Sequence, residues 1–103
     1  MGKNSALKTL GRRIGNIVLH KMLVIYTHKP ESISHLFHEE NEYRAAAIAD
    51  AKMFHWNDKD KQKLKTAAIK FFKNKSSKKY SDVSLSLKEA EVLINQELKD
   101  LNL

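Results

Sequence analysis

The densest group of side chains that could do chemistry lies in residues 35–44, HLFHEENEYR. His35 and His38 stand three residues apart, and Glu39 and Glu42 follow at spacings that place all four on one helical face. Two such histidines could ligate zinc. This face points away from the apolar stripe, whereas a catalytic metal needs a sheltered coordination position. The pattern therefore favours a solvated polar face over a metal site or a partner-binding face, and we expect no metal or other cofactor.

A second group is a pair of opposite charges within the apolar stripe of the same segment. Glu40 and Arg44 are four residues apart with the acid first, which is the favourable order for an ion pair on a helix. A charge on an apolar face must be paired, or its pKa must shift. One interpretation is an ion pair at the edge of the core. The other is a cleft against the first helix, lined by Lys21, Glu40, Tyr43 and Arg44, which holds a small ligand or fixes the helix register.

Lysines dominate residues 59–79, where nine lysines face a single acid, Asp60. A lysine ridge can follow a phosphate backbone without reading its sequence, and such binding depends strongly on salt. The competing interpretation is an ordinary solvated face that lies opposite acidic segments of the chain. The candidate nucleic-acid-binding residues are Lys63, Lys70, Lys73, Lys75, Lys78 and Lys79, with Arg12 and Arg13 as helpers.

Charge alternates in sign along the chain. Six basic residues and no acid give residues 1–29 a net charge of +6, whereas six acids against two basic residues give residues 30–58 a net charge of −4. The corresponding values are +8 for residues 59–79 and −3 for residues 80–103, and the total is +7. In an antiparallel bundle such segments would face one another, so part of the positive charge serves folding and melting should depend on salt. The surplus still favours an anionic partner.

The segment PESISHLFHEENEYRAAAIADA also permits a helix-turn-helix interpretation. Asn41 would supply the turn between two short helices, and the second helix would expose Tyr43 and Arg44 to DNA. Glu42 opposes this interpretation, because it is charged where such motifs usually need an apolar residue, and phosphates repel it. The helix-turn-helix therefore stays an alternative to one continuous helix.

The elements that must position these residues are helical, because apolar residues recur at three–four spacing almost throughout. Residues 17–26 are apolar nearly all round, which predicts a central helix, although MLVIYTH could also form a strand. Gly11 and Gly15 are spaced for close helix approach, or are simply tolerated on the surface. Asn57 and Asp58 predict a helix start, whereas the lysine- and serine-rich residues 73–82 predict a loop.

Size and composition limit the class of protein. The chain has 103 residues, no cysteine and one proline, which indicates a single domain over residues 1–103 without disulfides or thiolate metal sites. No apolar stretch approaches the ~20 residues that span a bilayer. The absence of cysteine fits a reducing compartment, and we expect a cytoplasmic protein. The predicted fold is all-α, a small four-helix bundle-like domain with helices at about 4–27, 31–56, 58–73 and 86–101.

Catalysis is not expected, because the chain has no Gly-rich phosphate loop, no cysteine nucleophile and no recognisable Ser–His–Asp order. The leading hypothesis is a basic, non-catalytic helical protein that binds RNA or DNA without strong sequence specificity. The alternatives are a regulator or adaptor that binds a protein, as small immunity-type bundles of similar size and charge do, and the helix-turn-helix DNA binder. The partner is thus nucleic acid or an acidic protein surface, and a second copy of the chain could cover residues 17–26.

Overall fold

Four α-helices make up most of the structure. The computed structural model describes residues 2–81 and 83–103, and over these residues it contains α1 (Lys3–Tyr26), α2 (Ile33–Ala51), α3 (Asp58–Lys79) and α4 (Leu87–Asp100). One 3-10 turn, η1 (Pro30–Ser32), precedes α2, and no strand occurs in this part of the chain. The predicted all-α, four-helix bundle-like class is confirmed, and the bounds of α1 and α4 agree with the prediction to within one residue.

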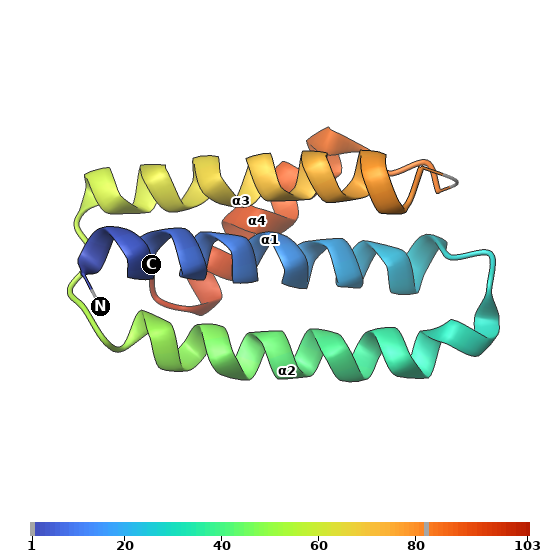
Figure 1. Ribbon diagram of the computed structural model, residues 1–103, viewed down its shortest axis with the longest axis horizontal. Coiled ribbons are helices and arrows are strands. Elements are labelled where there is room, and N and C mark those ends of the chain that lie inside the picture. Colours follow the sequence, from blue (N-terminus) through green and yellow to red (C-terminus); the bar gives the residue numbers. More distant parts are fainter. Residues whose placement is uncertain (1, 82) are drawn as a thin grey trace.

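The first helix is the centre of the bundle. Figure 1 shows α1 lying between α2 and α3, antiparallel to α2 and running in the same direction as α3, while α4 crosses behind it. α1 packs against all three other helices, and α4 packs against both α1 and α3. Since α1 is covered from several sides, its sequence must be apolar nearly all round.

Because α1 is central, it contributes more side chains to the core than any other helix. Residues 17–20 and Met22 and Leu23 are buried, as the all-round apolar pattern predicts, whereas Ile25 and Tyr26 emerge at the end of the helix. The fully buried apolar side chains include Leu10, Ile14, Ile17, Val18, Leu19 and Met22 of α1, Leu64 and Phe72 of α3, and Ile94 of α4. None of the helices over the described residues combines the length and apolar character that a bilayer crossing requires.

Two glycines set the distance between α1 and α3. A Cβ built on Gly11 would lie 2.6 Å from Cβ of Ala67, and one on Gly15 would lie 2.7 Å from the carbonyl oxygen of Ala68. Both distances are far shorter than van der Waals contact, so α3 can approach α1 this closely only because these positions carry no side chain. Of the two interpretations of these glycines, close helix approach is correct.

The second helix ends earlier than predicted, at Ala51 and not at residue 56. Trp56 is buried beneath this end, and its indole Nε1 donates a hydrogen bond of 2.9 Å to the carbonyl oxygen of Ala51. This contact satisfies one of the carbonyls that every helix end leaves free. α3 then starts with a capping box, in which Asn57 accepts from the backbone of Asp60 and the Asp60 side chain accepts from the backbone of Asn57, as the helix start predicted at Asn57 requires.

The third helix is longer than predicted, because the expected loop at residues 73–82 is helical as far as Lys79. Within this stretch, the hydroxyls of Ser76 and Ser77 donate to the carbonyl oxygen of Lys73, so these serines find partners inside the helix. Lys78 and Lys79 stand in the last turn, where positive charge interacts favourably with the helix dipole. The loop prediction was wrong for residues 73–79, because it used composition alone; residues 80 and 81 do leave the helix, and residue 82 lies outside the described residues.

The helix-turn-helix interpretation is also corrected by the course of α2. This helix runs unbroken from Ile33 to Ala51, through Asn41, so the turn that the motif requires does not form. Asn41 has no left-handed backbone, since Asn102 is the one non-glycine residue with positive φ among the described residues. The predicted helix at 31–56 is therefore one helix with a 3-10 turn before it.

Candidate functional site

Three of the four residues predicted to line a cleft meet around a carboxylate of α4. Arg44 donates to Glu97 through Nη2, at 2.6 Å from Oε1, and through Nε, at 3.4 Å from Oε2. Nη1 of Arg44 donates to Glu40 at 2.9 Å, and Nζ of Lys21 donates to Glu97 at 3.1 Å. We name Lys21, Glu40, Arg44 and Glu97 the buried charge cluster, which joins α1, α2 and α4.

The cluster is buried and electrically balanced. Glu97 is 1% exposed and Glu40 is 5% exposed, and two cations offset their two carboxylates. Burial acts to raise the pKa of Glu97, but the hydrogen bonds from Arg44 and Lys21 outweigh it, so the pKa is lowered. Hydrogen bonding to Glu97 likewise raises the pKa of Arg44. Glu97 and Arg44 are therefore charged at neutral pH, and the mutual contacts of the four side chains assign them to holding helices together.

The sequence indicated three members of this cluster and missed the fourth. Glu40 and Arg44 do form the predicted ion pair at the edge of the core, and Lys21 joins them. Glu97 went unnoticed although it lies next to Leu98 and three residues after Ile94, within the apolar stripe of α4. A charged residue inside that stripe is the same signal that singled out Glu40.

Tyr43, the fourth predicted cleft residue, lies on a different side of α2 and packs against His20. The two ring centroids are 5.3 Å apart. His20 is buried, and its Nδ1 lies 2.8 Å from the carbonyl oxygen of Asn16, so this nitrogen must carry the hydrogen. Its Nε2 lies 2.7 Å from Oε2 of Glu39. The histidine that matters for packing is thus His20, which lies within the apolar residues 17–26 and which the sequence did not single out.

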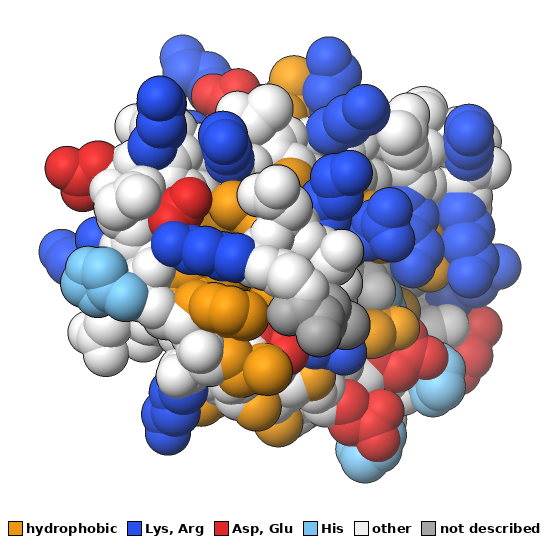
Figure 2. All heavy atoms as spheres, turned by 60° about the vertical axis from the view of Figure 1, so that its left-hand side comes forward, with side chains coloured by type: hydrophobic (Ala, Val, Ile, Leu, Met, Phe, Trp, Pro, Cys, Tyr) orange, Lys and Arg blue, Asp and Glu red, His pale blue; other side chains and the backbone are white. Residues whose placement is uncertain are grey.

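The histidine and glutamate face of residues 35–42 points outward, as the helical wheel predicts. His35 and His38 have side chains that are 73% and 72% exposed, and each lies beside the glutamate four residues later, Glu39 and Glu42. Figure 2 shows this kind of surface, with acidic and histidine side chains side by side at one edge of the molecule. Over the described residues, no group of three or more His, Cys, Asp or Glu residues is arranged to hold a metal ion.

The lysine ridge of α3 lies on the surface. Lys63, Lys70, Lys73, Lys78 and Lys79 are exposed, and within the described part of the chain they form no ion pair with a carboxylate. In the view of Figure 2, Lys and Arg side chains are densest over the upper and right-hand part of the surface, with acidic side chains at the upper left and the lower right.

Lys75 differs from the rest of the ridge, because it is half-buried. Its Nζ donates to Oδ1 of Asn16 at 3.3 Å and lies 5.2 Å from the ring centroid of Phe71. Burial and the neighbouring charge of Lys79 lower the pKa of Lys75. This lysine therefore links α3 to α1 as well as adding positive charge.

The two arginines named as helpers have different surroundings. Arg13 forms an ion pair with Asp50 of α2, so much of its charge is already compensated. Arg12 is exposed and lies at a groove between α1 and α3 with a volume of about 380 Å³. We name this the α1–α3 groove; its lining residues are Lys8, Arg12, Ala67, Lys70, Phe71 and Asn74. It brings Arg12 and Lys70 together and adds Lys8, which the sequence had not singled out.

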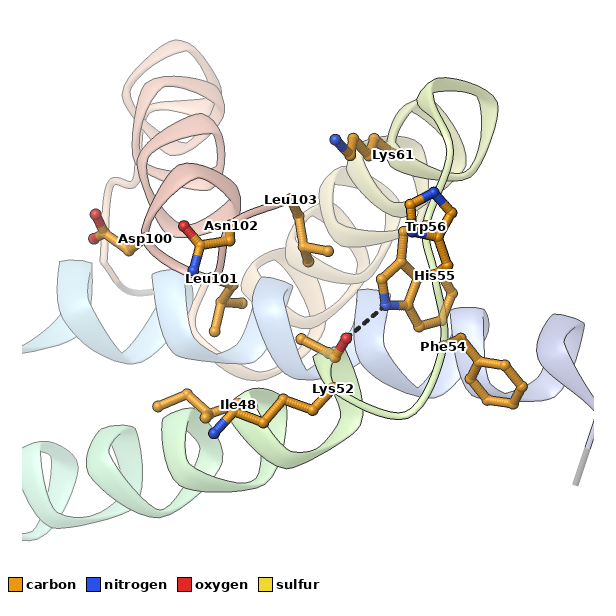
Figure 3. Close-up of a pocket in the computed structure, with 11 residues that line it drawn as sticks. Ile48, Lys52, Phe54, His55, Trp56, Lys61, Asp100, Leu101, Asn102 and Leu103 are labelled. Atoms are coloured by element: carbon orange, nitrogen blue, oxygen red, sulfur yellow. Dashed lines mark hydrogen bonds between the residues drawn. The ribbon is translucent and has the colours of Figure 1, made fainter.

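A larger hollow, of about 440 Å³, lies elsewhere, between the end of α2, the start of α3 and residues 100–103 (Figure 3). Its wall combines apolar side chains, among them Trp56 and Leu103, with Lys61 and the carboxylate of Asp100. The indole nitrogen of Trp56 is already occupied by its hydrogen bond to the chain, drawn in Figure 3. No residue predicted as a functional site lies there.

The α1–α3 groove is the hollow best suited to an anion, because three cations, Lys8, Arg12 and Lys70, line it. Among the described residues that line it, there is no carboxylate. Comparison of the whole chain with protein-family models, with characterised proteins and with solved structures found no match in any of the three, so its function has to be argued from this geometry.

Proposed function

We propose that this protein is a non-catalytic helical protein that binds nucleic acid, RNA or DNA, without strong sequence specificity. The observation that carries the proposal is the α1–α3 groove, where Lys8, Arg12 and Lys70 surround a surface hollow. Lys63 stands on the same side of α3, because it precedes Ala67, Lys70 and Asn74 at three–four spacing. A basic strip of this kind attracts phosphates through counterion release and needs no contact with base edges.

The positive charge on this strip is not neutralised by ion pairs with the described carboxylates of the protein. The ion pairs of α1 involve Lys3 with Asp60, Arg13 with Asp50, and Lys21 with Glu97. The ridge lysines beyond residue 61 form no such pair with the described carboxylates, although residues 61–79 contain eight lysines and no acid. This supports an anionic partner over the alternative in which acidic helices neutralise the ridge.

A salt titration with a fluorescently labelled oligonucleotide tests the proposal. We expect affinity that falls steeply as salt rises, and a loss of at least tenfold for the double substitution Lys70→Glu with Lys73→Glu. The matched control is Lys88→Glu with Lys99→Glu, which reverses the same number of exposed charges on α4. No binding at low salt, or equal weakening by both double substitutions, would contradict the proposal.

A regulator or adaptor that binds a protein is the second candidate. It is favoured by apolar side chains that stay exposed, of which Phe37 at 53% and Met53 at 64% are the largest in exposure outside α1 and α4. A partner that remains bound in a pull-down after nuclease treatment and washing at high salt would support this candidate. Either activity fits the reducing cytoplasm, which the absence of cysteine supports, and either can be combined with self-association.

A further inference from the structure

Two hollows lie side by side on the exposed face of α1 and share Arg12 and Phe71. The first is the α1–α3 groove, whose remaining polar groups are Lys8, Lys70 and Asn74. The second has a volume of about 230 Å³ and is lined by Thr9, Arg12, Arg13, Asn16, Tyr43 and Phe71. We name it the aromatic hollow. The first hollow is thus lined by three cations that pair with no carboxylate among the described residues. Its neighbour carries two aromatic rings, two neutral polar groups and the arginines Arg12 and Arg13, the second of which is paired with Asp50.

This pairing matches the chemistry of one nucleotide in a single strand. We infer that the protein binds single-stranded nucleic acid, with a phosphate in the α1–α3 groove and an unstacked base against Phe71 in the aromatic hollow. The inference rests on the proposed function and deepens it. In a duplex the bases are stacked on one another and only phosphates would reach this face, whereas a single strand can turn a base face toward an aromatic ring.

The ring of Phe71 is held in place, which lowers the entropic cost of stacking a base on it. A Cβ built on Gly15 would lie 3.2 Å from both Cβ and Cδ1 of Phe71, so the ring packs against bare backbone of α1. Nζ of Lys75 lies 5.2 Å from the ring centroid and is itself anchored on Asn16. Phe71 nevertheless remains partly exposed and lines both hollows.

The second ring is positioned as firmly. Tyr43 packs against the buried His20, which is fixed in turn by Asn16 and Glu39. Thr9 adds a hydroxyl to the same hollow and Asn16 adds an amide NH2, groups that can hydrogen-bond a base edge, while Oδ1 of Asn16 accepts from Lys75. Arg12, which lies between the hollows, can contact the phosphate on one side and the base on the other.

The experiment compares a fluorescein-labelled oligothymidylate of about twelve nucleotides with a duplex of the same length, by fluorescence anisotropy across a salt series. We expect the single strand to bind more tightly than the duplex. Phe71→Leu should weaken single-strand binding about tenfold while leaving the salt slope unchanged, because it removes stacking and no charge. Phe71→Tyr should restore most of the affinity. Lys70→Gln should instead reduce the salt slope by about one.

Phe37→Leu is the matched control, because Phe37 is an exposed phenylalanine of α2 outside both hollows, and it should leave binding unchanged. Arg12→Gln changes an exposed side chain that both hollows share, so it serves as the second probe if Phe71→Leu unfolds the protein by circular dichroism. Equal binding of duplex and single strand, or full single-strand affinity in folded Phe71→Leu, would overturn the inference while the proposed function stands. Binding of neither oligonucleotide would remove the proposed function itself.

Discussion

The buried charge cluster and the lysine ridge are both built from charged residues on helices, yet they do opposite things. In the cluster, Arg44 and Lys21 meet Glu97 within hydrogen-bond distance, and the carboxylate is almost inaccessible to water. On the ridge, Lys70 and Lys73 are exposed and have no carboxylate partner among the described residues. The charges of the cluster are thus neutralised by one another within the fold, whereas the charges of the ridge remain available to a partner.

The difference shows where the positive surplus of this chain comes from. α1 carries five cations and no acid in sequence, but three of these cations pair with acids, one each from α2, α3 and α4. α3 packs against α1 and α4 but has no close packing with the acidic α2. Charge alternation along the chain therefore gives three cations of α1 partners on the other helices, whereas the ridge lysines of α3 have no carboxylate partner among the described residues and keep their positive potential.

The largest expected effect is on the cluster. Glu97→Gln should lower the free energy of unfolding by about 3 kcal/mol, because the partly buried Lys21 and Arg44 lose the buried carboxylate that offsets their charge. Denaturant unfolding followed by circular dichroism measures it. Glu42→Gln, which changes an exposed carboxylate on the outer face of α2, should have almost no effect. Equal stability of the two variants would show that the cluster does not hold the helices together.

A smaller loss of stability is expected where α1 and α3 meet. Gly15→Ala should cost about 1–2 kcal/mol, because the new methyl group collides with the carbonyl oxygen of Ala68 and with Phe71, and this outweighs the better helix propensity of alanine. The melting temperature should fall accordingly. A stabilised variant would mean that the helices can separate freely, and that the hollows beside Phe71 are not rigid.

The cluster should also make the folding stability of the protein decrease at acidic pH. Since the pKa of Glu97 is lowered in the folded state, its contribution is fully present above the ordinary value of 4.5 and is lost as pH falls through the lowered pKa. Glu39 acts in the same direction: burial acts to raise its pKa, but the hydrogen bond with His20 and the neighbouring His20, His35 and Lys79 together outweigh burial, so the pKa is lowered. Stability should therefore fall below about pH 4.5, and the slope should be shallower in Glu97→Gln. If the slope of stability against pH is unchanged in Glu97→Gln, groups other than Glu97 cause the loss of stability in acid.

Substitutions on the ridge should have the smallest effect on stability. This effect should be stabilising, opposite in sign to that of the cluster substitutions. Neutralising Lys63, Lys70 and Lys73 to Gln should change the free energy of unfolding by no more than ~0.5 kcal/mol per residue. Added salt should raise the melting temperature of the unmodified protein, because it screens repulsion between exposed lysines more than it weakens buried pairs. The triple variant should show a flatter salt response. A melting temperature that falls with salt would mean that the ridge is paired.

Some features were readable from the chain because they depend on local rules. Asn57 starts α3 by capping, and the all-round apolar residues of α1 predict its central place. The Glu40–Arg44 pair follows from a four-residue spacing on a helix. Composition was a poorer guide: the lysines and serines after residue 73 resemble a loop, yet their side chains and backbone are satisfied within a helix.

The sequence by itself determined the helices of this protein, its sign of charge, and which residues of α2 are charged on an apolar face. Only the tertiary structure decided that Glu97 would meet Arg44 and Lys21, that Tyr43 would turn to His20, and that Arg12 would stand beside Lys70. The physical reason is that spacing fixes neighbours along one helix, whereas partners on different helices depend on how closely and in which direction the helices pack. Gly11 and Gly15 control that approach for α1 and α3, and so determine where the cations gather.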